Sequence, residues 1–225
     1  MINHRLLICG LLLASASSHA VTLDIRHEWL DDSKQHKDRI LISHRFANGI
    51  GLSFEDKWRS GDNNPNQPFN RMAGNGTETT LTYQYKATKS FFLQPGFAVE
   101  VNSGNKVYKP SLAAGYTFSN GIYFNTRYRY EETHYDNGNN DKKTHRGEIW
   151  LGYRLADWRF EYNYIYKHSN QVLFDNAKWD YEEDFKVAYN INHHWTPYAE
   201  IGNVSVRKNT HERQTRLRMG IQYSF

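Results

Sequence analysis

The chain closes on the stretch RQTRLRMGIQYSF, Arg213–Phe225, and this stretch decides the fold. Every second residue from Leu217 to Phe225 is apolar or aromatic, whereas Arg216 and Arg218 lie at positions between them. Successive side chains of a β-strand point to opposite faces, so this period of two predicts a strand with one apolar and one charged face. The stretch raises the question of which medium covers the apolar face.

The same alternation recurs through the chain and predicts about twelve strands, each with an apolar face opposite a charged or polar one. After Ala20, no apolar run is long enough for a membrane helix. The predicted strands cover residues 23–29, 39–46, 50–58, 78–86, 91–101, 108–118, 122–131, 146–155, 158–167, 179–189, 195–202 and 213–225.

The connections between these strands alternate in length. The tight ones are Ala47–Gly49, Ala87–Ser90, Ser119–Gly121, Ala156–Asp157 and Asn192–His194. The others are longer or more polar, such as those that begin at Arg59, Thr133 and His168. This alternation is typical of an outer-membrane barrel, with short turns in the periplasm and long loops outside, and an even strand number returns both termini to the periplasm.

A soluble sandwich would also alternate, so the placement of the aromatic residues decides between the two. Trp29, Trp58 and Trp179 lie near predicted outer strand ends, and Trp158 and Trp195 lie near inner ends. Aromatic girdles at both membrane interfaces have this placement. We therefore predict an all-β fold, a 12-stranded antiparallel up-and-down transmembrane β-barrel, whose apolar face meets lipid and whose charged face lines a narrow bore.

The N-terminal residues indicate the cellular address. Residues 1–20 carry a basic start, an apolar run and small residues before Val21, and we expect them to be a cleaved signal peptide. Residues 21–225 would then form a single outer-membrane β-barrel domain without cysteine, because the only cysteine is Cys9. The formal net charge of +4 is mild and contains no basic block, so we expect no nucleic-acid partner.

Several blocks of the sequence resemble the oligogalacturonate-specific porins, and the resemblance covers the whole chain after residue 20. The blocks are KDRILISHRFANGIGLS from Lys37, NGTE from Asn75, YRYE from Tyr128, GNVS from Gly202 and ERQTRLRMGIQYSF from Glu212. The resemblance implies a narrow, monomeric, twelve-stranded outer-membrane channel for acidic oligosaccharides from pectin breakdown. A sialic-acid channel belongs to the same wider family, so another acidic sugar is an alternative solute.

Inward basic side chains are the candidate solute contacts, because guanidinium groups bind carboxylates through paired hydrogen bonds and rings of Arg and Lys are used by anion pores. The candidates at mid-depth are Arg26, Arg127, Arg129, Arg216 and Arg218, and those nearer the mouth are Arg39, Lys109 and Arg146. Acidic residues, such as Glu28 and Glu148, are nearly as numerous as basic residues on the same face. Each of these cations is therefore either a solute contact or half of an ion pair that braces the wall.

The sequence offers no clear catalytic or metal-binding constellation. Its eleven histidines show no ligand spacing of the HExxH type, and Ser43 and His44 point to opposite faces. We expect no cofactor, no metal and no enzymatic activity, with an outer-membrane hydrolase as one alternative and a secreted carbohydrate-binding β protein as another. The expected partners are acidic oligosaccharides, outer-membrane lipid and the barrel-insertion machinery, which would read the terminal Phe225.

Overall fold

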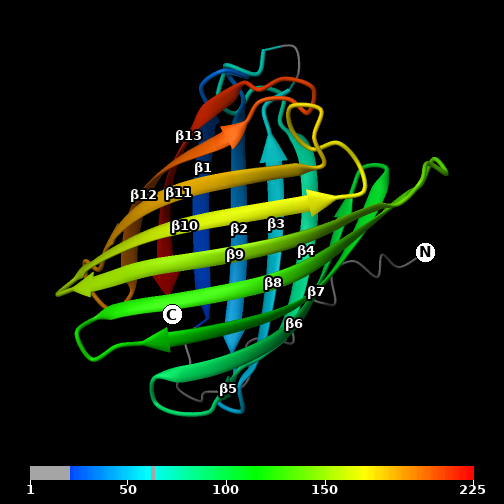
Figure 1. Ribbon diagram of the computed structural model, residues 1–225. Helices are drawn as coiled ribbons and strands as arrows, with labels where there is room; N and C mark the ends of the chain where they lie inside the picture. The colour runs from blue at the N-terminus through cyan, green and yellow to red at the C-terminus, as the bar shows by residue number, and fades with distance from the viewer. Residues whose placement is uncertain (1–20, 62–63) are drawn as a thin grey trace, which may run out of the picture.

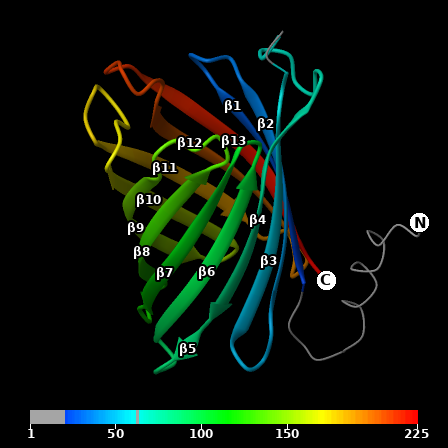
Figure 2. The same ribbon diagram turned by 90° about the vertical axis from the view of Figure 1, so that its right-hand side faces the viewer.

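The computed structural model describes residues 21–61 and 64–225, so the predicted signal peptide, residues 1–20, lies outside the described residues. No helix in the described ranges is long and apolar enough to cross a membrane. The described chain forms antiparallel strands that wrap into a single closed wall (Figures 1 and 2).

Thirteen strand segments are present in the described residues, and two of them belong to one barrel strand. Their bounds are β1 Thr22–Leu30, β2 His36–Arg45, β3 Ile50–Arg59, β4 Ala73–Tyr83, β5 Tyr85–Lys86, β6 Phe91–Asn102, β7 Asn105–Thr117, β8 Ile122–Tyr135, β9 Lys142–Leu155, β10 Trp158–Ser169, β11 Trp179–Tyr189, β12 Trp195–Ser205 and β13 Arg213–Ser224. β4 and β5 are separated only by Gln84, and both pair with β6. The twelve strands predicted from the sequence are thus confirmed.

The sheet closes on itself at two junctions. β1 pairs with β13 from Thr22 opposite Ser224 to Leu30 opposite Arg216. β4 pairs with β6, which joins the two ends of the remaining strand order. A closed sheet leaves no row of unpaired backbone groups, which is the condition for crossing a bilayer with strands.

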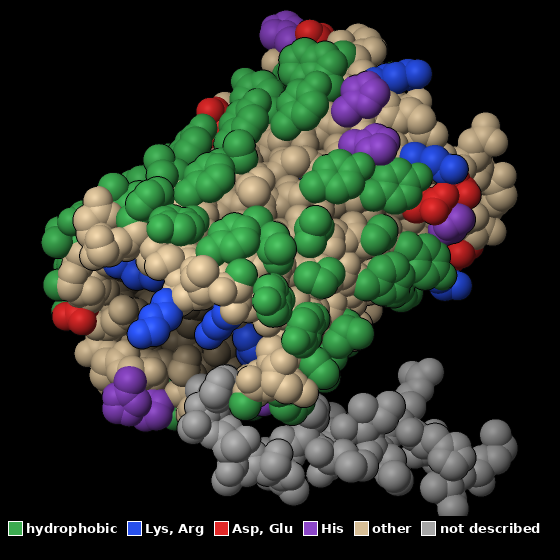
Figure 3. Space-filling model, turned by 60° about the horizontal axis from the view of Figure 1, so that its bottom comes forward, with side chains coloured by type: hydrophobic (Ala, Val, Ile, Leu, Met, Phe, Trp, Pro, Cys, Tyr) green, Lys and Arg blue, Asp and Glu red, His purple; other side chains and the backbone are tan. Residues whose placement is uncertain are grey.

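The two faces of the wall have opposite chemistry, as the alternation predicted. The outer face carries apolar side chains that are exposed, such as Leu112 at 53% and Met219 at 70%. The inner face buries charged side chains, among them Glu148 at 2% and Arg216 at 8%. Figure 3 shows the hydrophobic side chains spread over the outside of the wall. This distribution is the reverse of that in a soluble protein, and it suits a wall with lipid outside and water inside.

The short turns gather at the end of the barrel that carries the C-terminus (Figure 1). Two of them have the same construction, FANGI and FSNGI: Gly49 and Gly121 adopt φ near +90° and donate to the carbonyls of Phe46 and Phe118. Glycine suits this left-handed conformation because it has no Cβ. Each turn therefore connects two adjacent antiparallel strands, β2 to β3 and β7 to β8.

The opposite end carries the longer connections, with one exception. Residues 31–35, 60–72, 136–141, 170–178 and 206–212 join strands there, whereas β6 and β7 are joined by Ser103 and Gly104 alone. Trp29, Trp58 and Trp179 lie at this end of their strands, while Trp158 and Trp195 lie at the short-turn end. The two predicted aromatic girdles are thus in place, and we call the short-turn end periplasmic on this basis.

Candidate functional site

The inner face of the barrel is the candidate site, because it collects charged side chains from every part of the wall. Cations with a carboxylate partner there are Lys37, Arg39, Lys57, Lys109, Arg127, Arg129, Arg146, Lys167, Arg216 and Arg218. All eight residues predicted from the sequence lie on this face. Seven of those eight appear in this set, and the eighth is Arg26.

One ion-pair network joins β8 to β9 around Glu148. Arg127 lies directly opposite Glu148 and binds it through both carboxylate oxygens, with Nη2–Oε2 and Nη2–Oε1 distances of 2.8 and 2.9 Å. The Nε atom of Arg146 lies 2.9 Å from the same carboxylate. Arg146 and Arg129 also contact Glu131, at 3.8 and 2.7 Å. Three of the predicted cations therefore share two carboxylates.

A second network runs from β1 to β7. Arg39 of β2 bridges Asp24 and Glu55, with Nη2–Oδ1 and Nη1–Oε2 distances of 2.9 and 3.1 Å. Lys109 of β7 contacts Glu78 at 2.6 Å and also binds Glu100. Lys57 connects the two halves of this network, because it contacts both Glu55 and Glu100.

A third network closes the seam between β11, β12, β13 and β1. Arg216 binds Asp184 at 2.6 Å and Glu182 at 3.1 Å. Arg218 binds Glu28 at 2.7 Å and also contacts Glu200. Paired charges of this kind cross-link neighbouring strands of the wall. Because the fields of paired charges largely cancel beyond a few ångströms, these cations attract a passing solute less strongly than unpaired ones would.

Arg26 differs from the other seven predicted cations, because within the described ranges its guanidinium group has neither an ion pair nor a hydrogen bond. It lies on β1 between Asp24 and Glu28, and both of these acids are already bound, Asp24 to Arg39 and Glu28 to Arg218. The residue opposite Arg26 on β2 is Arg39, a like charge. Arg26 is therefore a cation whose nearest carboxylates are engaged elsewhere.

Other inward cations also lack a carboxylate partner in the described part of the chain, and none of them is among the eight predicted residues. They are Arg45, Lys86, Lys142, Arg154, Arg159 and Lys186. One signal was readable in advance: Arg154 and Arg159 flank the two-residue turn Ala156–Asp157, so a hairpin places them opposite each other, as the structure does. Two like charges opposite each other on neighbouring strands do not neutralise one another.

Two aromatic rings on the inner face are covered by cations. The Arg154 guanidinium lies over the ring of Tyr123 at 4.7 Å, and the Lys186 ammonium lies over the ring of Tyr198 at 3.8 Å. Tyr198 is 6% exposed and donates its hydroxyl to Asp24 at 2.9 Å. These contacts orient the cations, since an aromatic face attracts positive charge.

The periplasmic opening displays the basic side chains directly. Figure 3, which brings this end forward, shows Lys and Arg side chains gathered inside a hollow in the wall. The hollow is the mouth of the bore, because the surrounding strands close into a complete barrel. A solute in this mouth would meet positive charge on several sides.

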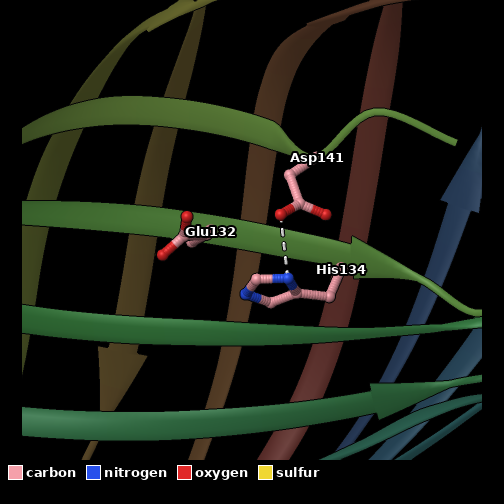
Figure 4. Close-up of side chains that lie close together, drawn as sticks. All are labelled: Glu132, His134 and Asp141. Atoms are coloured by element: carbon pink, nitrogen blue, oxygen red, sulfur yellow. Dashed lines mark ion pairs between the residues drawn. The ribbon is translucent and has the colours of Figure 1, made fainter. Parts of the chain in front are cut away.

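A separate polar cluster lies at the outer end of β8 and β9. Glu132, His134 and Asp141 place one ligand atom each within 4.8 Å of one another, and Figure 4 shows the imidazole of His134 turned toward Asp141. The His134 Nδ1–Asp141 Oδ2 distance is 2.9 Å, and Glu132 already pairs with Lys143 at 3.4 Å. Ion pairing accounts for this grouping, and strand alternation puts Glu132 and His134 on the outer face, away from the bore.

Comparison with known proteins places these features in a family. The family model described as oligogalacturonate-specific porin protein (KdgM) matches residues 14–225. The chain is 41% identical to the oligogalacturonate-specific porin KdgM of Dickeya dadantii over 224 residues, covering 95% of each chain. It is 42% identical to the protein YiiY of Salmonella typhimurium over 215 residues, covering 95% of this chain and 94% of YiiY.

Solved structures agree with the sequence comparison. The KdgM porin in complex with disordered oligogalacturonate superposes with a TM-score of 0.69 at 34% identity, over 91% of this chain and 99% of that one. The NanC porin has the same fold, with a TM-score of 0.77 at 19% identity, over 90% of this chain and 100% of that one. The chain, a closed twelve-stranded barrel with a charged bore, therefore belongs to the oligogalacturonate-specific porin family of outer-membrane channels.

Proposed function

We propose that this barrel lets acidic oligosaccharides diffuse across the outer membrane and that oligogalacturonates are its solutes. Arg26 carries the proposal: a guanidinium on the bore face that binds no other described residue is available to a carboxylate. The 41% identical relative named as an oligogalacturonate-specific porin and the solved complex of a 34% identical porin with oligogalacturonate support this choice of solute.

Passage in this scheme uses several weak contacts rather than one tight site. Each sugar of an oligogalacturonate carries a carboxylate, so one chain can contact several cations of the bore in turn. Weak, multiple sites permit both entry and release, as conduction requires. The ion-paired cations, including Arg39, Lys109, Arg127, Arg129, Arg146, Arg216 and Arg218, serve in this scheme chiefly to brace the wall.

The test is conductance of the purified barrel in a planar bilayer. Trigalacturonate is compared with a neutral trisaccharide of similar size at equal concentration. We expect anion selectivity and block by trigalacturonate at concentrations at which the neutral sugar has little effect. Cation selectivity or equal block by the two sugars would overturn the acidic-sugar assignment. Sialic acid at the same concentration tests the alternative solute.

We also propose that the channel acts as a monomer and without turnover of its solute. The described strands close within one chain, so no second copy is needed to complete the bore. Incubation with trigalacturonate followed by product analysis tests the turnover claim, because a hydrolase would release shorter fragments. Assembly with Phe225 deleted tests its proposed role as the signal for the insertion machinery, and unimpaired assembly would remove that role.

A further inference from the structure

The cations without carboxylate partners are unevenly distributed along the bore. Arg45 and Lys86 lie at the periplasmic ends of β2 and β5, and Arg154 and Arg159 flank the periplasmic turn between β9 and β10. Lys186 lies three residues from the periplasmic end of β11. With Arg26 these residues form what we call the inner cation group. Among the inward cations described, Lys142, the first residue of β9, lacks a partner at the opposite, outer end.

The local reason for this asymmetry is the placement of the acids. Glu200 lies opposite Lys186 in the strand register, but its carboxylate is bound by Arg218. Asp24, the inward acid nearest the start of β1, is bound by Arg39, Tyr198 and Gln222. Glu161 lies opposite Lys186 on the other side, on β10, and its carboxylate accepts the Tyr123 hydroxyl at 2.6 Å rather than pairing with Lys186. The inner cation group therefore keeps a net positive charge.

From this asymmetry we infer a carboxylate-binding site that extends from the middle of the bore, at Arg26, to its periplasmic end, where Arg159 and Lys186 lie with Arg154 beside them. The inference rests on the proposed function and specifies where in the bore the acidic solute is held. Unpaired charges attract an anion more strongly than paired ones, whose fields largely cancel beyond a few ångströms. The outer half, in which the ion-pair networks are concentrated, would act as a passage with little retention.

The first test compares two substitutions that break no ion pair. Lys186→Gln removes one unpaired lysine from the inner cation group, and Lys142→Gln removes one from the outer end. We expect Lys186→Gln to weaken block by trigalacturonate about fivefold, as one exposed charge contact predicts, and Lys142→Gln to change it less than twofold. Equal effects, or a larger effect at Lys142, would overturn the inference.

Arg159→Gln combined with Lys186→Gln provides a second variant for the same measurement. We expect a larger loss than for Lys186→Gln alone, up to about 25-fold, because Arg159 and Lys186 are diagonal neighbours on β10 and β11 and both contribute to the site. Folding of each variant is checked by its shift in gel mobility on heating. If wild-type block does not distinguish trigalacturonate from the neutral sugar, the proposed function fails. If trigalacturonate blocks the wild type selectively but blocks the double variant equally well, the proposed function stands and only the proposed binding site is wrong.

The second test uses the sidedness of the site. Trigalacturonate is added to one side of the bilayer at a time, and Ser119→Cys, in a periplasmic turn, marks that side by its reaction with a membrane-impermeant maleimide. We expect faster block from the periplasmic side, because the solute then reaches the inner cation group without passing the ion-pair networks. Equal or slower block from that side would contradict the location.

Discussion

Glu148 shows how a barrel wall accommodates charge at the scale of one residue. Its carboxylate is 2% exposed and receives Arg127 and Arg146 together. A carboxylate buried with two guanidinium groups neutralises both in part and fixes their positions. Removing one partner of such a cluster costs more than the cluster contributes, because the remaining charges lose their counter-ion.

Replacing that carboxylate should therefore have two effects. Glu148→Gln keeps the shape but leaves Arg127 and Arg146 with less negative charge. We expect a loss of about 2 kcal/mol in the free energy of unfolding and a shift of the reversal potential toward stronger anion selectivity. Urea unfolding in vesicles and bilayer recording in a salt gradient measure the two. Unchanged selectivity would show that these arginines do not act on ions in the bore.

Arg26 and Arg39 offer a matched comparison, since they lie opposite each other on β1 and β2. Arg39→Gln breaks contacts with Asp24 and Glu55, so we expect it to lower the free energy of unfolding by about 1–3 kcal/mol. Arg26→Gln breaks none, and we expect unchanged stability with weaker block by trigalacturonate. The same two measurements apply. Equal destabilisation by both changes would contradict the distinction between brace and contact.

At the scale of the strand, tyrosines packed on glycines hold the inner face together. A Cβ at Gly152 would lie 2.0 Å from Cζ of Tyr123, and a Cβ at Gly220 would lie 2.4 Å from Cζ of Tyr198. The absent side chains let each ring lie flat on the neighbouring strand, which in turn positions the cations above the rings. β9 also contains Gly147, where a Cβ would meet nothing within 4 Å.

This contrast within β9 predicts opposite outcomes for one change. Gly152→Ala forces the Tyr123 ring away and should cost about 1–3 kcal/mol, the usual range for overpacking. Gly147→Ala adds a methyl group in open space and should leave stability unchanged or slightly higher, since alanine restricts the unfolded chain more than glycine does. Urea unfolding of the two variants in the same vesicles decides. Similar losses at both positions would show that backbone strain, not the ring, matters.

At the scale of the whole molecule, the barrel depends on lipid outside as much as on ion pairs inside. Met219 is 70% exposed in the middle of β13, whereas Met72 is 44% exposed in the loop before β4. We expect Met219→Lys to destabilise the barrel in vesicles by about 2–4 kcal/mol and Met72→Lys to be near neutral. If the two lysines are tolerated equally, the assignment of the lipid face is wrong.

The sequence predicted the barrel well because alternation is a local property. The twelve strands and the aromatic girdles all follow from residues within one strand, and the structure confirms them. Pairing of charges is not local: whether Arg26 or Arg39 takes Asp24 depends on side chains reaching across three strands. The inner cation group escaped prediction for the same reason, except at Arg154 and Arg159, where a two-residue turn fixes the register.

The backbone contact between Phe225 and Val21, an N–O distance of 3.0 Å, has a consequence for how the wall is connected. Because the two residues are adjacent, the order of strands around the barrel is circular. The same barrel can therefore be formed by a chain whose termini lie in a different loop. A circular permutant that joins the two residues by a short linker and opens within 206–212 should refold in detergent to the same barrel. Its last strand would then be β12 rather than β13. Comparing its refolding in detergent with its assembly in cells would therefore separate the stability of the barrel from a signal carried by the C-terminal strand.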